Sequence, residues 1–160
     1  MNLECLTLLN ADIETDGAAA IGTLCGGIGR RCSKLQIERS KLTEEGCFAL
    51  AAGLRNDCGR SQLAELRLIS CRLGRAGSTG AAAIAQALGT CCALKTLFMV
   101  DVGMQDTDVV AFAAGVLAKA KRGSPTAQDV ASSSTGVLML ETLLLHNNEI
   151  GDCGACAAGS

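Results

Sequence analysis

The strongest constraint on the fold of this chain is an internal repeat. One pattern of spaced apolar residues, L-x-x-L-x-L-x₄-I-x₃-G, occurs five times across the 160 residues. The copies begin at Leu3, Cys32, Leu63, Leu94 and Leu140, at intervals of 29, 31, 31 and 46 residues. A repeat of this length encodes one supersecondary unit, which buries its apolar face only by stacking on its neighbours. Stacked units form an extended surface much more often than a catalytic pocket.

Each copy has the pattern of a strand followed by a helix. In the third copy, Leu66, Arg67 and Leu68 alternate apolar and polar side chains, which is the period of a half-buried strand. Residues 46–54 and 80–88 then place apolar side chains four positions apart, as on the buried stripe of an amphipathic helix. We expect parallel strands centred on 6–8, 35–37, 66–68, 97–99 and 143–145. Right-handed crossovers should place all the helices on one face of the sheet.

These residues resemble the ribonuclease-inhibitor class of leucine-rich repeats, whose consensus is L-x-x-L-x-L-x-x-[N/C]-x-[L/I]. That class also occurs in NOD-like receptors and in the Ran GTPase-activating protein. The resemblance implies an α/β leucine-rich-repeat solenoid (a horseshoe) with a curved parallel sheet inside and helices on the convex side. Cys71 and Asn148 match the Asn/Cys position, where a polar side chain can bond the backbone of the neighbouring turn. The departures from the pattern are Ala11, Ser40 and Val102 at that position, and Asp108 at a helix-start glycine.

The whole chain, 1–160, is expected to be a single domain of about five repeats. The repeat boundaries are 1–31, 32–62, 63–93, 94–139 and 140–160, the last one truncated. Residues 119–136 are rich in Gly, Ser, Pro and Thr, so we expect a loop or disordered insertion that explains the longest interval. The helix before it should end near Arg122, which overlaps the start of that segment. Because both ends are abrupt, we expect the chain to be a fragment of a longer array.

The amino-acid composition of the chain limits which classes of binding partner are plausible. The net charge of −2 argues against nucleic acid, which requires a basic face to neutralise phosphates. No apolar run approaches the ~20 residues of a membrane span, so we expect no membrane partner. Many of the ten cysteines fall where small apolar residues belong, such as Cys25, Cys32 and Cys47. We interpret them as reduced, buried spacers in a cytoplasmic protein.

We expect neither a catalytic centre nor a metal site. Cys153 and Cys156 have C-x-x-C spacing, which is also found in zinc sites and redox pairs. Zinc would require further ligands, and His146 is the only histidine in the chain. A thioredoxin-like motif would require a different setting of strands and helices. We therefore interpret the two cysteines as small helix residues, and we expect no catalytic residue, no cofactor, no metal and no enzymatic activity.

The concave face of the expected sheet is the best candidate for a binding site. Its outward strand positions carry four apolar residues in neighbouring copies: Ile69, Phe98, Val100 and Leu144. With Arg67 and His146 beside them, these are the predicted partner-binding residues. A contiguous apolar patch with a polar rim is typical of a protein-binding surface. The alternative interpretation is sequence drift in a fragment.

The sequence thus predicts a protein–protein interaction module that binds its partner through the concave face. The resemblance suggests a segment of a NOD-like-receptor-type protein. The alternative is a segment of a Ran-type GTPase-activating protein, which would act on a GTPase partner through an Arg or Asn on a strand-to-helix loop. Arg39 and Asn147 stand at such positions.

Overall fold

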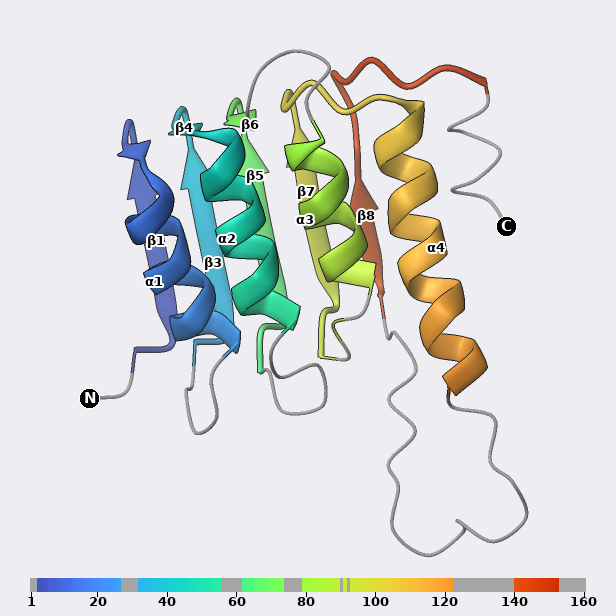
Figure 1. The fold of residues 1–160 in the computed structure, drawn as a ribbon, viewed down its shortest axis with the longest axis horizontal. Coiled ribbons are helices and arrows are strands. Elements are labelled where there is room, and N and C mark those ends of the chain that lie inside the picture. The colour runs from blue at the N-terminus through green and yellow to red at the C-terminus, as the bar shows by residue number, and fades with distance from the viewer. Residues whose placement is uncertain are drawn as a thin grey trace, which may run out of the picture.

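The computed structural model describes residues 3–26, 32–55, 62–73, 79–89, 91, 93–122 and 140–152. Within them the fold is α/β, with a parallel sheet of five strands and four helices that lie side by side over one of its faces (Figure 1). Five main strands follow one another across the sheet in chain order: β1 (Cys5–Leu9), β3 (Lys34–Glu38), β5 (Glu65–Ile69), β7 (Thr96–Val100) and β8 (Thr142–Leu144). The predicted parallel pairing is confirmed at every one of these junctions.

Short strands and helices complete the units. A second sheet of three short strands consists of β2 (Asp12–Ile13), β4 (Lys41–Leu42) and β6 (Arg72–Leu73). The helices are α1 (Thr15–Gly26), α2 (Glu44–Arg55), α3 (Gly80–Gly89) and α4 (Asp106–Arg122). Each of the first three described units therefore runs from a main strand through a short strand to a helix.

The core lies between the main sheet and the helices. In β3, β5 and β7 burial alternates along the strand, so that every second residue faces the helices. Leu35, Leu66 and Leu97 are register partners and are almost completely buried, as the repeat pattern predicts. The equivalent residues at the two ends of the sheet, Leu6 and Leu143, are only partly buried. The burial of each unit's leucines thus depends on a neighbour on both sides.

All five main strands are followed by the same turn. The residue directly after each of the first four main strands has a positive φ, and so does Asn147, which follows β8 at a distance of three residues. These φ angles lie between 48° and 57°, and the first four residues are Asn10, Arg39, Ser70 and Asp101. This left-handed conformation is tolerated by Asn and Asp but costs most other residues about 1–2 kcal/mol. The turn therefore belongs to the repeat and is adopted regardless of side chain.

In three units the polar residue after that turn links the unit to the one before it, and these residues are Ser40, Cys71 and Asn148. Asn148 donates from its amide nitrogen to the carbonyl oxygens of Met99 (2.6 Å) and Leu145 (2.7 Å). Its amide oxygen accepts the backbone N–H groups of Val102 and Met104, both at 3.1 Å. The bonding that we predicted for this position is therefore confirmed for Asn148.

Cys71 and Ser40 occupy the same position in earlier units. The single hydrogen of the Cys71 thiol is shared between the carbonyl oxygens of Ile37 and Ile69, which lie 3.1 and 3.3 Å from the sulfur. Ser40 departs from the consensus, yet its hydroxyl accepts the N–H of Ala11 and donates to its own strand. The departure at Ser40 thus preserves the contact between units.

The fourth helix departs from the repeat pattern at its start and ends at Arg122, as predicted. Asp108 replaces the expected glycine, and its buried carboxylate accepts the N–H of Gln105 at 2.8 Å, which satisfies a backbone donor at the helix start. The helix ends at Arg122, so residues 119–122 are helical and do not belong to the predicted loop. Lys, Ala and Arg are good helix formers, which explains why the helix continues through them. The rest of the predicted loop, 123–136, lies outside the described residues.

Candidate functional site

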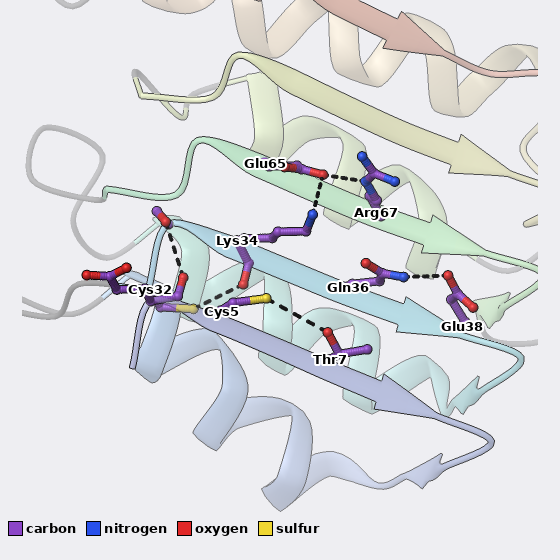
Figure 2. Close-up of polar contacts among 10 residues, drawn as sticks. Cys5, Thr7, Cys32, Lys34, Gln36, Glu38, Glu65 and Arg67 are labelled. Carbon is purple, nitrogen blue, oxygen red and sulfur yellow. Dashed lines mark hydrogen bonds and ion pairs between the residues drawn. The ribbon is translucent and has the colours of Figure 1, made fainter. Parts of the chain in front are cut away.

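The candidate site lies on the face of the main sheet that the helices leave uncovered, which we call the open face. Its residues are the strand positions that do not face the core. Figure 2 shows several of them standing in front of β1, β3 and β5, with the helices behind the strands. The open face thus presents three parallel rows of side chains that cross the strands from unit to unit.

The structure brings together five of the six predicted partner-binding residues. Arg67, Phe98 and Leu144 are register partners on β5, β7 and β8, and Ile69 pairs with Val100 in the next row. All five side chains are partly exposed. We call Ile69, Phe98, Val100 and Leu144 the apolar patch.

The prediction for His146 was wrong in one respect. We expected it on the last strand in the row of Val100, but β8 ends at Leu144, before His146, although β8 keeps the predicted register with β7. β8 is the edge strand of the described sheet, so it is held by a neighbour on one side only. His146 is exposed beyond the strand end, and its carbonyl oxygen accepts the N–H of Asp101 at 3.3 Å. It borders the apolar patch at the turn.

The Phe98 ring is covered in part by Arg67. The guanidinium carbon of Arg67 lies 4.5 Å from the ring centroid, which is the geometry of a cation–π contact. We expected Arg67 on the rim of the patch, whereas the structure places it over the aromatic residue at the centre. The aliphatic part of an arginine packs well on a ring while its charged head stays in water.

A charged cluster adjoins the patch, and sequence reasoning missed it. Glu65 Oε1 accepts from Lys34 Nζ at 3.0 Å and from Arg67 Nε (Figure 2). Burial raises the pKa of the Glu65 carboxyl, but the bonds from Lys34 and Arg67 outweigh this effect and lower the pKa below its usual value. We call Lys34, Glu65 and Arg67 the charged cluster. Its signal in the sequence was the strand register, which pairs Lys34 with Glu65.

The other polar side chains on the open face of β1 and β3 contact residues of their own strand. On β3, the Gln36 amide donates to the Glu38 carboxylate at 2.5 Å. On β1, the Cys5 and Thr7 side chains lie 3.8 Å apart. Figure 2 shows both pairs on the open face. These contacts fix side chains along their own strand, whereas the charged cluster links two units.

The described cysteines behave as buried spacers, as we predicted for most of them. Cys25, Cys32, Cys47 and Cys71 are each at most 3% exposed. The Cys25 thiol donates to Cys32 Sγ at 3.8 Å. Burial raises the pKa of Cys25 and Cys71, and it raises the pKa of Cys47 to about 12. Protonated, buried thiols are poor nucleophiles.

The described residues give little support for metal binding or for a membrane-spanning helix. They contain no group of three or more His, Cys, Asp or Glu side chains that could hold a metal ion. None of their helices has the length and apolar character needed to cross a bilayer. Cys153 and Cys156 lie outside the described residues. A hollow of about 540 Å³ beside β2, β4 and β6 is lined by charges of both signs, without His or Cys.

Arg39 and Asn147, which the GTPase-activating alternative singles out, share one structural role. Both occupy the left-handed turn that follows each main strand, together with Asn10, Ser70 and Asp101. Their conformation therefore follows from the repeat, and it does not mark either residue as a catalytic group.

Comparison with known proteins adds no family. No protein-family model matches this chain, and no curated protein is similar to it.

Proposed function

We propose that this chain is a protein-binding module built as a leucine-rich-repeat array of the ribonuclease-inhibitor type. Support for the array comes from in-register parallel strands and a left-handed turn that recur in successive units, and from a polar residue that bonds the preceding unit at Ser40, Cys71 and Asn148. In such an array the sheet curves into a horseshoe-shaped solenoid, and the open face becomes its concave surface.

The observation that carries the binding proposal is the apolar patch on the open face. Phe98, Ile69, Val100 and Leu144 are neighbours, partly exposed, and on the face without helices. Their side chains contribute little to the core of the fold. A partner protein that covers them would remove their apolar surface from water, and this burial would favour binding. Aromatic anchors of this kind contribute about 2 kcal/mol or more at protein interfaces.

The proposed partner is another protein, and the module itself has no catalytic role. The parent protein is of the NOD-like-receptor type. Its compartment is the reducing cytoplasm, which suits buried free thiols such as Cys32, Cys47 and Cys71. The geometry provides no specific support for the GTPase-activating alternative, because Arg39 and Asn147 take the conformation that the repeat imposes.

The proposal is tested by selecting binders and then truncating Phe98. Peptides selected from a random display library on the wild-type protein should bind Phe98→Ala at least about tenfold more weakly, because the aromatic anchor is lost. Thr96→Ala, on the same strand and face but outside the patch, is the matched control and should change affinity little. Melting curves of both variants should overlay that of the wild type. Equal affinity for wild type and Phe98→Ala would contradict the proposal.

A further inference from the structure

The charged cluster on the open face carries an uncompensated positive charge. Lys34 and Arg67 both bind one carboxylate oxygen, Glu65 Oε1. The Lys34 and Arg67 side chains remain 33% and 32% exposed. A lysine ammonium has three N–H donors and an arginine has five, so both retain donors beyond those that Glu65 uses.

Glu38 offsets this charge only in part. It is at the opposite end of β3, four residues from Lys34, which corresponds to roughly 13 Å along a strand and exceeds the screening length of about 8 Å at physiological salt. It is nearer to Arg67, because it lies two residues beyond Gln36, the register partner of Arg67, so the charge of Lys34 is the less compensated one. Glu38 also accepts a hydrogen bond from Gln36, which lies between it and Lys34. Because the two bonds to Glu65 favour its ionised form, the cluster has two positive charges and one negative charge at neutral pH.

Arg67 joins this cluster to the apolar patch. The same guanidinium bonds Glu65 and stacks on Phe98. Parallel strands lie about 4.8 Å apart, so the space between β3 and β5 is about 10 Å from the space between β7 and β8. The open face therefore offers a cationic position and an apolar position at a fixed separation.

We infer that the open face binds an acidic–apolar segment of a partner protein. One carboxylate of that segment binds Lys34 and Arg67, and a large aliphatic or aromatic side chain about 10 Å away packs on Phe98, Val100 and Leu144. This inference rests on the proposed function, because it names the partner chemistry of the same face. Charge complementarity selects this occupant over a basic or purely apolar segment.

The probe is a random library of displayed peptides of about 12 residues, which are long enough to span about 40 Å when extended. After selection on the wild-type protein, synthetic copies of the enriched peptides are titrated by fluorescence anisotropy. We expect the enriched peptides to share an Asp or Glu together with a large apolar residue. Replacing that acidic residue by Gln should weaken binding at least about tenfold.

Variants of the protein in which a charge is reversed test the inferred contact with the acidic residue most sharply. Arg67→Glu should lower affinity at least about tenfold, and exchanging the peptide's acidic residue for Lys should recover part of the loss. Lys41→Glu makes the same change of charge on β4, away from the open face, and should leave affinity unchanged. If Arg67→Glu fails to fold, Lys34→Gln removes the excess charge with a smaller perturbation, and it should weaken binding in the same direction.

The outcomes separate the inference from the proposed function. Peptides that require Phe98 but carry no acidic residue, and that bind Arg67→Glu as well as wild type, would overturn the inference and leave the proposed function standing. Peptides that bind Phe98→Ala unchanged would overturn both. Dimerisation of the wild-type protein that Phe98→Ala abolishes, measured by light scattering, would identify a second copy as the occupant and overturn the inference. Loss of binding in both variants with rescue by the Lys peptide supports it.

Discussion

At the scale of single residues, Asn148 is the strongest link between two units. Its amide bonds the carbonyl oxygens of Met99 and Leu145 and the N–H groups of Val102 and Met104. Ser40 and Cys71 each make two contacts from the same position. Asparagine makes more bonds because its amide has two N–H donors and an oxygen that can accept twice, whereas a hydroxyl or thiol has a single hydrogen.

Asn148→Ala should therefore lower the free energy of unfolding by about 2–4 kcal/mol, because it leaves buried backbone groups without partners. Ser40→Ala, which removes two bonds, should cost about 1 kcal/mol. Chemical denaturation of the two variants measures the difference. A loss for Asn148→Ala no greater than that for Ser40→Ala would show that the bonds across the unit junction contribute little.

The Glu65 carboxylate should make stability depend on acidity. Burial raises its pKa, but the bonds from Lys34 and Arg67 lower the pKa by more, so the folded value lies below the unfolded value. The folded protein then binds this proton less tightly than the unfolded chain does. The contribution of Glu65 is present above the unfolded pKa of about 4.3 and is lost as pH falls through the folded pKa. Denaturation of wild type and Glu65→Gln between neutral pH and about pH 3 should show their difference shrinking on acidification; a constant difference would contradict this assignment.

At the scale of elements, α1 and α2 pack closely because two glycines face each other. A Cβ added at Gly53 would lie 2.5 Å from the backbone of Gly22. A side chain there must push the helices apart. At Gly17 in α1, by contrast, the nearest atom to an added Cβ is the Ile13 side chain at 3.7 Å, which is an ordinary contact.

Two glycine-to-alanine substitutions should therefore change the free energy of unfolding in opposite directions. Gly53→Ala should destabilise the protein by about 1–3 kcal/mol, because the overlap forces a backbone shift. Gly17→Ala should stabilise it by about 0.5–1 kcal/mol, because alanine is the better helix former and finds room. Thermal melts of the two variants test the pair. A stabilising Gly53→Ala would mean that α1 and α2 are farther apart than described.

The sequence predicted the elements well because their patterns are local. Alternation located the first four main strands, and apolar spacing located α2 and α3. The fifth strand has the pairing that the repeat spacing predicts but ends at Leu144, because it lies at the edge of the described sheet and pairs on one side only. The end of α4 was open to two interpretations, since helix-forming residues run directly into a polar segment.

The site was predictable only in part because it depends on contacts between units. Alternation was enough to place Phe98 and Val100 on the open face. It could not show that Arg67 lies over the ring, or that Lys34 and Arg67 share one carboxylate oxygen. The repeat pattern gives the strand register, but those contacts also depend on side-chain conformations, which the pattern does not encode.

At the scale of the whole molecule, the described chain has apolar surface on both sides. The apolar patch lies on the open face, whereas Val110 and Leu117 are 49% and 58% exposed on α4. An exposed aliphatic pair on a helix is ordinary in a soluble protein, and in an array it can face another unit. The open face differs because its apolar residues adjoin the charged cluster, which can orient a partner. We therefore assign binding to the sheet and not to α4.

Methyl chemical-shift mapping by NMR tests this assignment most directly. A peptide selected on the wild-type protein is titrated into protein labelled at its Ile, Leu and Val methyl groups. We expect the largest shifts at Ile69, Val100 and Leu144, while the methyl groups of Val110 and Leu117 stay unchanged. Shifts concentrated on Val110 and Leu117, with the open-face methyl groups unaffected, would contradict this assignment.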